Sequence, residues 1–138
     1  MKVIYWSGTG NTEEMAKLIA QGIDSEGKKA ELVNISNDKV SEIESVVILG
    51  CPSMGAEELE EGEFRPFFDE IKDSLNDKEV VIFGSYGWGD GEWLRTWEEE
   101  VLSVGGKMTL EPFMVNNEPE GEDVDRCIDF GKEIAKLG

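Results

Sequence analysis

Short apolar runs alternate along the chain with stripes of apolar residues at helical spacing. The runs at residues 3–6, 46–51 and 80–83 are continuously apolar, which predicts short strands buried on both faces. Apolar residues three and four positions apart predict four helices, each with one buried face. The stripes are Met15, Leu18, Ile19, Gly22 and Ile23; Phe64, Phe67, Phe68 and Ile71; Trp93, Leu94, Trp97, Val101 and Leu102; and Val124, Cys127, Ile128 and Gly131.

Two further strands are expected at the edges of the sheet. Residues 30–35 alternate polar and apolar, and residues 108–115 contain Pro112, which favours an edge because it lacks an N–H. The alternation of strands and helices predicts one domain over residues 1–138. Its fold is a doubly wound α/β fold, with helices on both faces of a five-stranded parallel sheet. Ligands bind such sheets beyond the carboxyl ends of the strands, so the loops after Trp6, Cys51, Phe83 and Val115 are the candidate site.

Composition narrows the possible partners. The 138 residues are 39% hydrophobic, enough for one core, and 13 Lys and Arg against 31 Asp and Glu give a formal net charge of -18. This charge repels nucleic acid and anionic membrane surfaces, which are excluded as partners. The longest uncharged apolar stretch, residues 46–49, is too short to span a membrane. The first residues do not resemble a signal peptide, so we expect a cytoplasmic protein.

The lack of histidine limits the chemistry that the side chains can perform. Without His, every nucleophile that depends on an imidazole is excluded, as is the commonest metal ligand. Cys51 and Cys127 are far apart and have no C-x-x-C partner, which argues against zinc and against a dithiol redox pair. Both cysteines are expected to be buried. The chemistry is therefore expected to come from a cofactor.

The first loop has the composition of a phosphate site without a cation. It consists of Ser7, Gly8, Thr9, Gly10, Asn11 and Thr12. Its glycines allow N–H groups to turn inward, its hydroxyls and amide are neutral donors, and the helix that follows adds a partial positive charge. The loop lacks the Lys of a Walker motif, and Glu13 stands where a dinucleotide motif needs glycine. The alternative is a simple helix start with Asn11 as N-cap and Glu14 three residues later.

The second and third loops carry an aromatic and a thioether side chain. Trp88 lies among four glycines in residues 84–91, as an exposed surface for stacking a flat ligand requires. Met54, in the second loop, can contact the other face of a ring. The alternative is that Trp88 covers the core and Met54 fills a gap in it. Together with a phosphate loop at the same sheet edge, the two side chains point to a mononucleotide such as FMN.

Residues 3–12, continuing through Ala16 and Leu18, resemble the flavodoxin signature. Residues 52–55 and 84–91 resemble the short-chain flavodoxins of anaerobic bacteria, and the resemblance extends over nearly the whole chain. It implies strand order 2-1-3-4-5, with FMN bound where the strand order reverses.

The resemblance also implies a role for each site residue. Those implied to hold the phosphate are Ser7, Thr9, Asn11 and Thr12, with the N–H groups of Gly8 and Gly10. Trp88 and Met54 are implied to cover the two faces of the isoalloxazine, and Glu57 is implied to accept a hydrogen bond from N3–H. The implied contacts to the ribityl chain or the ring edge are Ser53, Ser85 and Asn117. The third loop also includes Tyr86, Gly87 and Gly89. In the family the peptide matching Gly55-Ala56 turns over on reduction and offers a carbonyl to flavin N5. Ala56 departs from the polar or acidic residue that other members often carry.

The implied function is that of a low-potential one-electron carrier, which cycles FMN between semiquinone and hydroquinone and has no substrate of its own. Five acids at positions 57, 58, 60, 61 and 63 would form a negative face around the flavin edge. This face would be steered toward basic docking patches on redox enzymes. The net charge favours a monomer. One alternative is an FMN-dependent quinone or flavin reductase on the same fold. A receiver domain is disfavoured because Ser7 and Cys51 stand where it needs an acid.

Overall fold

A computed structural model describes residues 1–40 and 42–138, and all five strands form one parallel sheet. The order β2-β1-β3-β4-β5 confirms the predicted topology. The elements are β1 (Lys2–Tyr5), α1 (Asn11–Ser25), β2 (Glu31–Asn34), β3 (Val46–Gly50), α2 (Phe64–Ile71), the 3-10 helix η1 (Lys72–Leu75), β4 (Glu79–Tyr86), α3 (Glu92–Ser103), β5 (Phe113–Asn116) and α4 (Glu122–Ala135).

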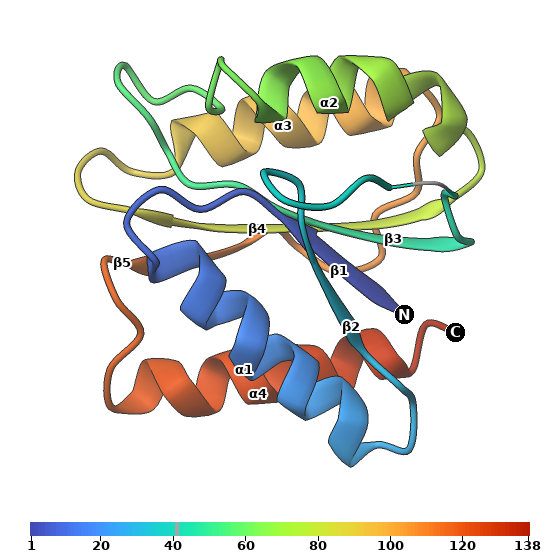
Figure 1. Cartoon of the computed structure of the whole chain (residues 1–138), viewed down its shortest axis with the longest axis vertical. Coiled ribbons are helices and arrows are strands. Elements are labelled where there is room, and N and C mark those ends of the chain that lie inside the picture. The colour runs from blue at the N-terminus through green and yellow to red at the C-terminus, as the bar shows by residue number, and fades with distance from the viewer. Residues whose placement is uncertain (41) are drawn as a thin grey trace.

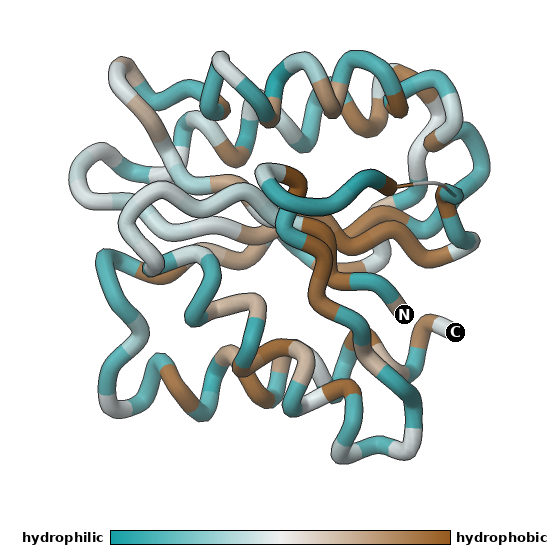
Figure 2. Tube along the Cα trace, in the orientation of Figure 1, coloured by the Kyte–Doolittle hydropathy of each residue, from teal (hydrophilic) through white to brown (hydrophobic). Residues whose placement is uncertain are grey.

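The helices cover both faces of the sheet, with α2 and α3 on one face and α1 and α4 on the other (Figure 1). Because side chains alternate along a strand, the sheet divides the apolar residues into two cores. Ile4, Leu49 and Ile82 face α2 and α3, whereas Ile48 and Val81 face α1 and α4. Hydrophobic positions accordingly concentrate in the central strands, and the loops at one end of the sheet are paler (Figure 2). No helix of the described residues is long and apolar enough to cross a membrane.

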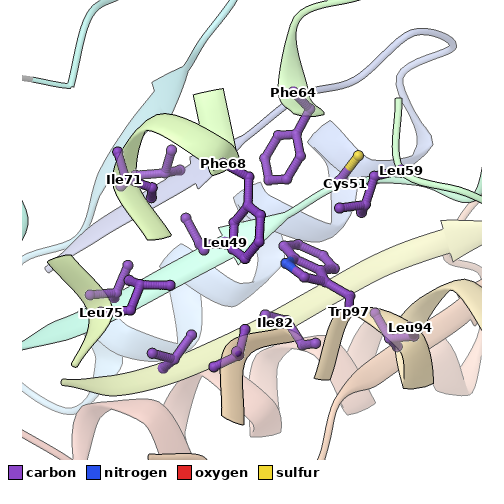
Figure 3. Packing of buried hydrophobic residues seen from close by; sticks show 14 of the residues in the cluster. Leu49, Cys51, Leu59, Phe64, Phe68, Ile71, Leu75, Ile82, Leu94 and Trp97 are labelled. Carbon is purple, nitrogen blue, oxygen red and sulfur yellow. The ribbon is translucent and has the colours of Figure 1, made fainter. Parts of the chain in front are cut away.

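Aromatic side chains fill the core under α2 and α3. The Trp97 ring is nearly perpendicular to those of Phe64 and Phe68, with centroids 5.3 and 6.0 Å away, which is a favourable edge-to-face geometry. Trp97 Nε1 is buried with no hydrogen-bond partner among the described residues. In Figure 3 this nitrogen lies on the side of the indole that faces Phe68. The aromatic contacts fix the position of α3 and hence of the loop that precedes it.

The predicted elements differ from the structure mainly at their ends. Leu102 was expected in the buried stripe of α3, but it is 52% exposed because it lies one position past Val101, about 100° around the helix. The last strand is shorter than residues 108–115: it begins after Pro112, and only Lys107 of the preceding segment bridges to β4. Strand β4 instead extends to Tyr86, three residues beyond the apolar run.

Candidate functional site

Four loops meet at the carboxyl ends of the strands, on the left in Figure 1, and the two chain termini lie at the opposite end. They follow β1, β3, β4 and β5, as predicted. A cavity of about 260 Å³ opens between them. Its wall is formed by Gly8, Thr9, Asn11, Pro52, Ser53, Met54, Ser85, Tyr86, Gly87 and Asn117. Nine of these ten residues are predicted site residues, and Pro52 is the addition.

The remaining predicted residues do not line this cavity, although all of them are described. They are Ser7, Gly10, Thr12, Gly55, Ala56, Glu57, Trp88 and Gly89. Pro52 escaped the prediction because proline has no N–H and offers a ligand no donor. Its place in the loop after β3, two residues past the end of that buried strand at Gly50, was the available signal.

The first loop turns sharply before α1. Gly10 adopts φ 99°, a conformation that favours glycine, and is itself the N-cap of the helix. The alternative in which Asn11 caps the helix is therefore wrong, because Asn11 already lies in the first turn. Ser7 Oγ instead accepts the N–H groups of Gly10 and Glu13, each at 3.2 Å. Its hydroxyl proton stays available to an acceptor outside the loop.

Backbone donors remain unused in this loop. Within the described chain, the N–H groups of Gly8, Thr9, Asn11 and Thr12 have no hydrogen-bond acceptor. Unpaired N–H groups at a helix N-terminus form an anion site, because the helix dipole adds to their partial charge. The loop therefore fits a phosphate group, and it does so without a Lys or Arg in its sequence.

Two hydroxyls connect the first loop to β4. The side chain of Thr12 is buried, and its Oγ1 lies 2.9 Å from Ser85 Oγ. The Ser85 N–H also points at Thr12 Oγ1, at 3.4 Å. The resemblance implies separate ligand contacts for these residues, whereas in the structure their hydroxyls bond to each other and fix the first loop against the end of β4.

Met54 and Trp88 are exposed beside the cavity, with 40% and 65% of their surfaces accessible. The alternative that Trp88 covers the core and Met54 fills a gap in it is therefore wrong. A tight turn carries Met54: its N–H donates to the Glu58 carbonyl at 2.8 Å, and the Glu58 N–H donates back at 2.9 Å. Within the turn Gly55 and Glu57 both have left-handed backbones, with φ 52° and 55°. A non-glycine residue in this region is strained, as is common at binding sites.

The Glu57 carboxylate bridges the second and third loops. Its Oε1 accepts the N–H groups of Gly91 and Glu92, both at 3.2 Å, at the start of α3. A side chain on Gly89 would collide with this carboxylate, and φ 87° also requires glycine there. Among the described residues, no donor occupies Oε2, so this oxygen can accept a further hydrogen bond.

Asn117 meets the third loop from β5. Its N–H donates to the Tyr86 carbonyl at 2.8 Å, and the Asn116 side chain donates to the same carbonyl at 3.1 Å. Asn117 has φ 58°, which Asn tolerates better than most residues. The structure thus brings the predicted Asn117 beside Tyr86 and Gly87.

The two cysteines take no part in the site. Both are free and buried, as predicted. Burial raises the pKa of the Cys51 thiol far above its usual value, and burial followed by the charge of Asp123 raises the pKa of Cys127 to about 12. Both thiols are therefore uncharged at neutral pH and unreactive.

The fold and the site together define the class of protein. A doubly wound sheet with an anion-binding loop at its switch point, and with exposed Trp and Met side chains beside that loop, is the architecture of a mononucleotide-binding α/β protein.

Comparison with known proteins identifies the family. The flavodoxin family model matches residues 3–131. The chain is 50% identical to the flavodoxin of Clostridium beijerinckii, over 99% of this chain and 100% of that protein. It is 38% identical to the flavodoxin of Megasphaera elsdenii, over 99% and 98%. The solution structure of two-electron reduced Megasphaera elsdenii flavodoxin has a TM-score of 0.86 at 37% identity and covers 98% of both chains.

The chain belongs to the flavodoxin family. Flavodoxins are small electron carriers that bind FMN, so this chain is an electron-transfer flavoprotein and not an enzyme. The alternative of a quinone or flavin reductase is not favoured.

Proposed function

We propose that residues 1–138 form a single domain in which FMN binds across the four loops, and that residues 7–12 hold its phosphate. The unused N–H groups of Gly8, Thr9, Asn11 and Thr12 support this assignment, and they are the observation on which the proposal depends. The Ser7 hydroxyl, oriented by two N–H groups, completes the donor set. When bound, FMN supplies the one-electron redox chemistry of the protein.

The flavin ring then has residues of this chain on each side. Trp88 and Met54, both exposed at the same sheet edge, would cover its two faces. Glu57 would accept N3–H through Oε2, because Oε1 is held by the start of α3. Ser53, Ser85 and Asn117 would contact the ribityl chain or the ring edge, and the Gly55-Ala56 peptide would lie near N5. The left-handed backbone of Gly55 is compatible with a peptide that turns over.

Negative charge beside the site favours a low reduction potential. At roughly 15 Å and an effective dielectric of about 20, one carboxylate raises the free energy of an added negative charge by about 1 kcal/mol, or about 40 mV for one electron. Several acids surround the turn after Met54. Their crowding is evident at Glu61, whose pKa is raised by a side-chain hydrogen bond with Glu58 and then by the charge of that residue.

We further propose that the protein is a cytoplasmic monomer. It would dock on redox enzymes by binding basic patches on the surfaces of those enzymes. The net charge of -18 supports the monomeric state, because two copies of the chain repel each other. The same negative charge attracts the basic surface of a partner. The two free, buried thiols agree with a reducing compartment.

Binding of FMN to the apoprotein tests the site. We expect Trp88→Ala to raise the dissociation constant of FMN by about tenfold or more, because one face of the ring loses its aromatic contact. The matched control is Leu102→Ala, which removes an exposed apolar side chain on α3 and should leave the constant unchanged. A protein that does not bind FMN would refute the proposal.

Reductive titration tests the redox role. Stepwise addition of dithionite to the FMN-loaded protein should produce a transient long-wavelength absorbance band, as a one-electron carrier requires. Rapid bleaching by NADH alone, without a reductase, would contradict the carrier role and favour a reductase.

A further inference from the structure

The Trp6 indole packs directly against the phosphate loop. A Cβ built on Gly8 would lie 2.9 Å from Trp6 Cη2 and 3.3 Å from Cζ3. The six-membered part of the indole therefore contacts the Gly8 backbone, and glycine is the residue that fits. Gly8 is exposed and has unusual backbone freedom, so this contact restrains a segment that would otherwise be mobile.

A carboxylate from a distant part of the chain fixes this indole. Trp6 Nε1 donates to Glu63 Oε1 at 3.0 Å, although 57 residues separate the two. The same oxygen accepts a second hydrogen bond, from the Ser36 hydroxyl at 2.9 Å. Glu63 is itself held in place at the N-cap of α2, where its N–H donates to Glu60 Oε1 at 2.7 Å. The Trp6 backbone is fixed as well, since its N–H donates to the Gly50 carbonyl at 3.0 Å.

We infer that Trp6 and Glu63 are positioning residues for the phosphate of FMN. The Glu63 carboxylate orients the indole, and the indole restrains the Gly8 peptide, which lies beside the unpaired N–H groups of Gly8 and Thr9. Ordering these groups before the ligand arrives reduces the entropy lost on binding. The inference depends on the proposed FMN site and adds to it a support that comes from the start of α2.

Removal of the carboxylate should weaken binding of the phosphate in particular. We expect Glu63→Ala to raise the dissociation constant of FMN by about tenfold, and to leave that of riboflavin, which lacks the phosphate, within about twofold. Glu63→Gln keeps an acceptor for Trp6 Nε1 and should restore FMN binding, which separates the hydrogen bond from the charge. Ser36→Ala removes the other partner of Glu63 and is the matched control.

A double-mutant cycle tests the contact between the indole and Gly8. Gly8→Ala should weaken FMN binding by about tenfold in the wild-type chain, because the new methyl group meets the indole. In the Trp6→Ala background the same change should cost about twofold or less, since the obstructing ring is gone. Thermal unfolding of every apoprotein variant checks that the fold is retained.

The outcomes separate this inference from the proposed function. Equal losses for FMN and riboflavin would overturn the inference, because Trp6 would then support the ring or the whole site. Unchanged FMN binding in Glu63→Ala, or additive effects in the cycle, would also overturn it. If the wild-type protein binds neither ligand, the proposed function itself fails.

Discussion

At the scale of single residues, the Tyr5 hydroxyl makes the fold sensitive to alkali. It donates to Glu13 Oε2 at 2.8 Å from a buried position on β1. Burial, and then the hydrogen bond to Glu13, raise the pKa of Tyr5 to about 12. In the unfolded chain this pKa is near 10, so the folded state favours the protonated form. Its stabilising contribution is complete below about pH 10 and is lost as the pH rises from about 10 to 12.

Comparison with Tyr5→Phe isolates this contribution. The wild-type protein should lose about 2 to 3 kcal/mol more unfolding free energy than Tyr5→Phe between about pH 9 and 12, as measured by urea denaturation. The raised pKa values of Cys51 and Cys127 also lower the unfolding free energy as the pH rises. This decrease is the same in the wild-type protein and in Tyr5→Phe, so it cancels in the comparison. Parallel pH profiles for the two proteins would contradict the assignment.

The chemistry of individual site residues was largely predictable from the sequence, but their pairing was not. Trp88 among glycines predicted an exposed indole, because few neighbours could bury it, and the structure has it exposed. The bond between the hydroxyls of Thr12 and Ser85 joins residues 73 positions apart and left no local signal. Ser7 appeared only as a donor, since nothing in the sequence indicated that it accepts two N–H groups from its own loop.

At the scale of elements, the closest helix contact lies between α1 and α4. A Cβ on Gly131 would fall on the Ile19 carbonyl, and one on Gly22 would fall on the Ile128 carbonyl. Replacement of an exposed helical glycine by alanine stabilises a helix by about 1 kcal/mol. Here we expect the opposite sign: Gly131→Ala should lower the free energy of unfolding by about 1 to 3 kcal/mol, because the two backbones must separate.

Urea denaturation measures this change. The matched control is Gln21→Ala, which lies next to Gly22 on the exposed side of α1 and should change stability by no more than about 0.5 kcal/mol. A more stable Gly131→Ala protein would mean that the helices can move apart at no cost, and that the glycines are not required for packing.

Helix α2 begins at a carboxylate that takes the place of an N-cap side chain. Glu60 Oε1 accepts the N–H groups of Glu63 and Phe64 at 2.7 and 2.8 Å, and Oε2 accepts that of Gly62 at 2.7 Å. Burial alone would raise the pKa of Glu60, but these three hydrogen bonds outweigh it and lower the pKa. The stabilisation is therefore present above the unfolded pKa, near 4.3, and is lost as the pH falls through the folded value.

Glu60→Gln should lower the free energy of unfolding by about 1 to 2 kcal/mol at pH 7. The difference from wild type should shrink as the pH falls below about 4, because a protonated Glu60 resembles glutamine. Urea denaturation across this range measures both effects. Glu99→Gln, an exposed glutamate on α3 without these bonds, serves as the control. A pH-independent difference for Glu60→Gln would contradict the ionic cap.

Apolar periodicity located each helix but not the ends of each element. The stripe from Phe64 to Ile71 coincides with α2, because those side chains bury the face toward the sheet. Leu102 misled the prediction, since a leucine in the last turn of a helix need not face the core. Strand β5 is shorter than predicted because the residues before Pro112 do not pair as part of the strand. Pairing depends on the neighbouring strand β4, and the local sequence of a segment does not encode where its partner strand lies.

At the scale of the whole molecule, stability must withstand the repulsion among 31 acidic residues that only 13 basic residues offset. Most ion pairs in the described structure are exposed, such as Arg95 with Asp90 and Lys107 with Asp77. Such pairs contribute little, so screening them removes little stability. Screening the excess of negative charge removes a larger unfavourable term, because repulsion is distributed over the compact surface and relaxes on unfolding.

Added salt should therefore stabilise the fold. We expect the Tm of the FMN-saturated protein at pH 7 to rise by roughly 4 to 8 °C between about 10 mM and 0.5 M NaCl, over which the Debye length falls from about 30 Å to a few ångströms. Near pH 4 many carboxylates are protonated, so the same addition of salt should shift the Tm much less. A rise of equal size at both pH values would indicate a general salting-out of apolar surface. A fall at pH 7 would mean that the exposed ion pairs matter more to the fold than its net charge.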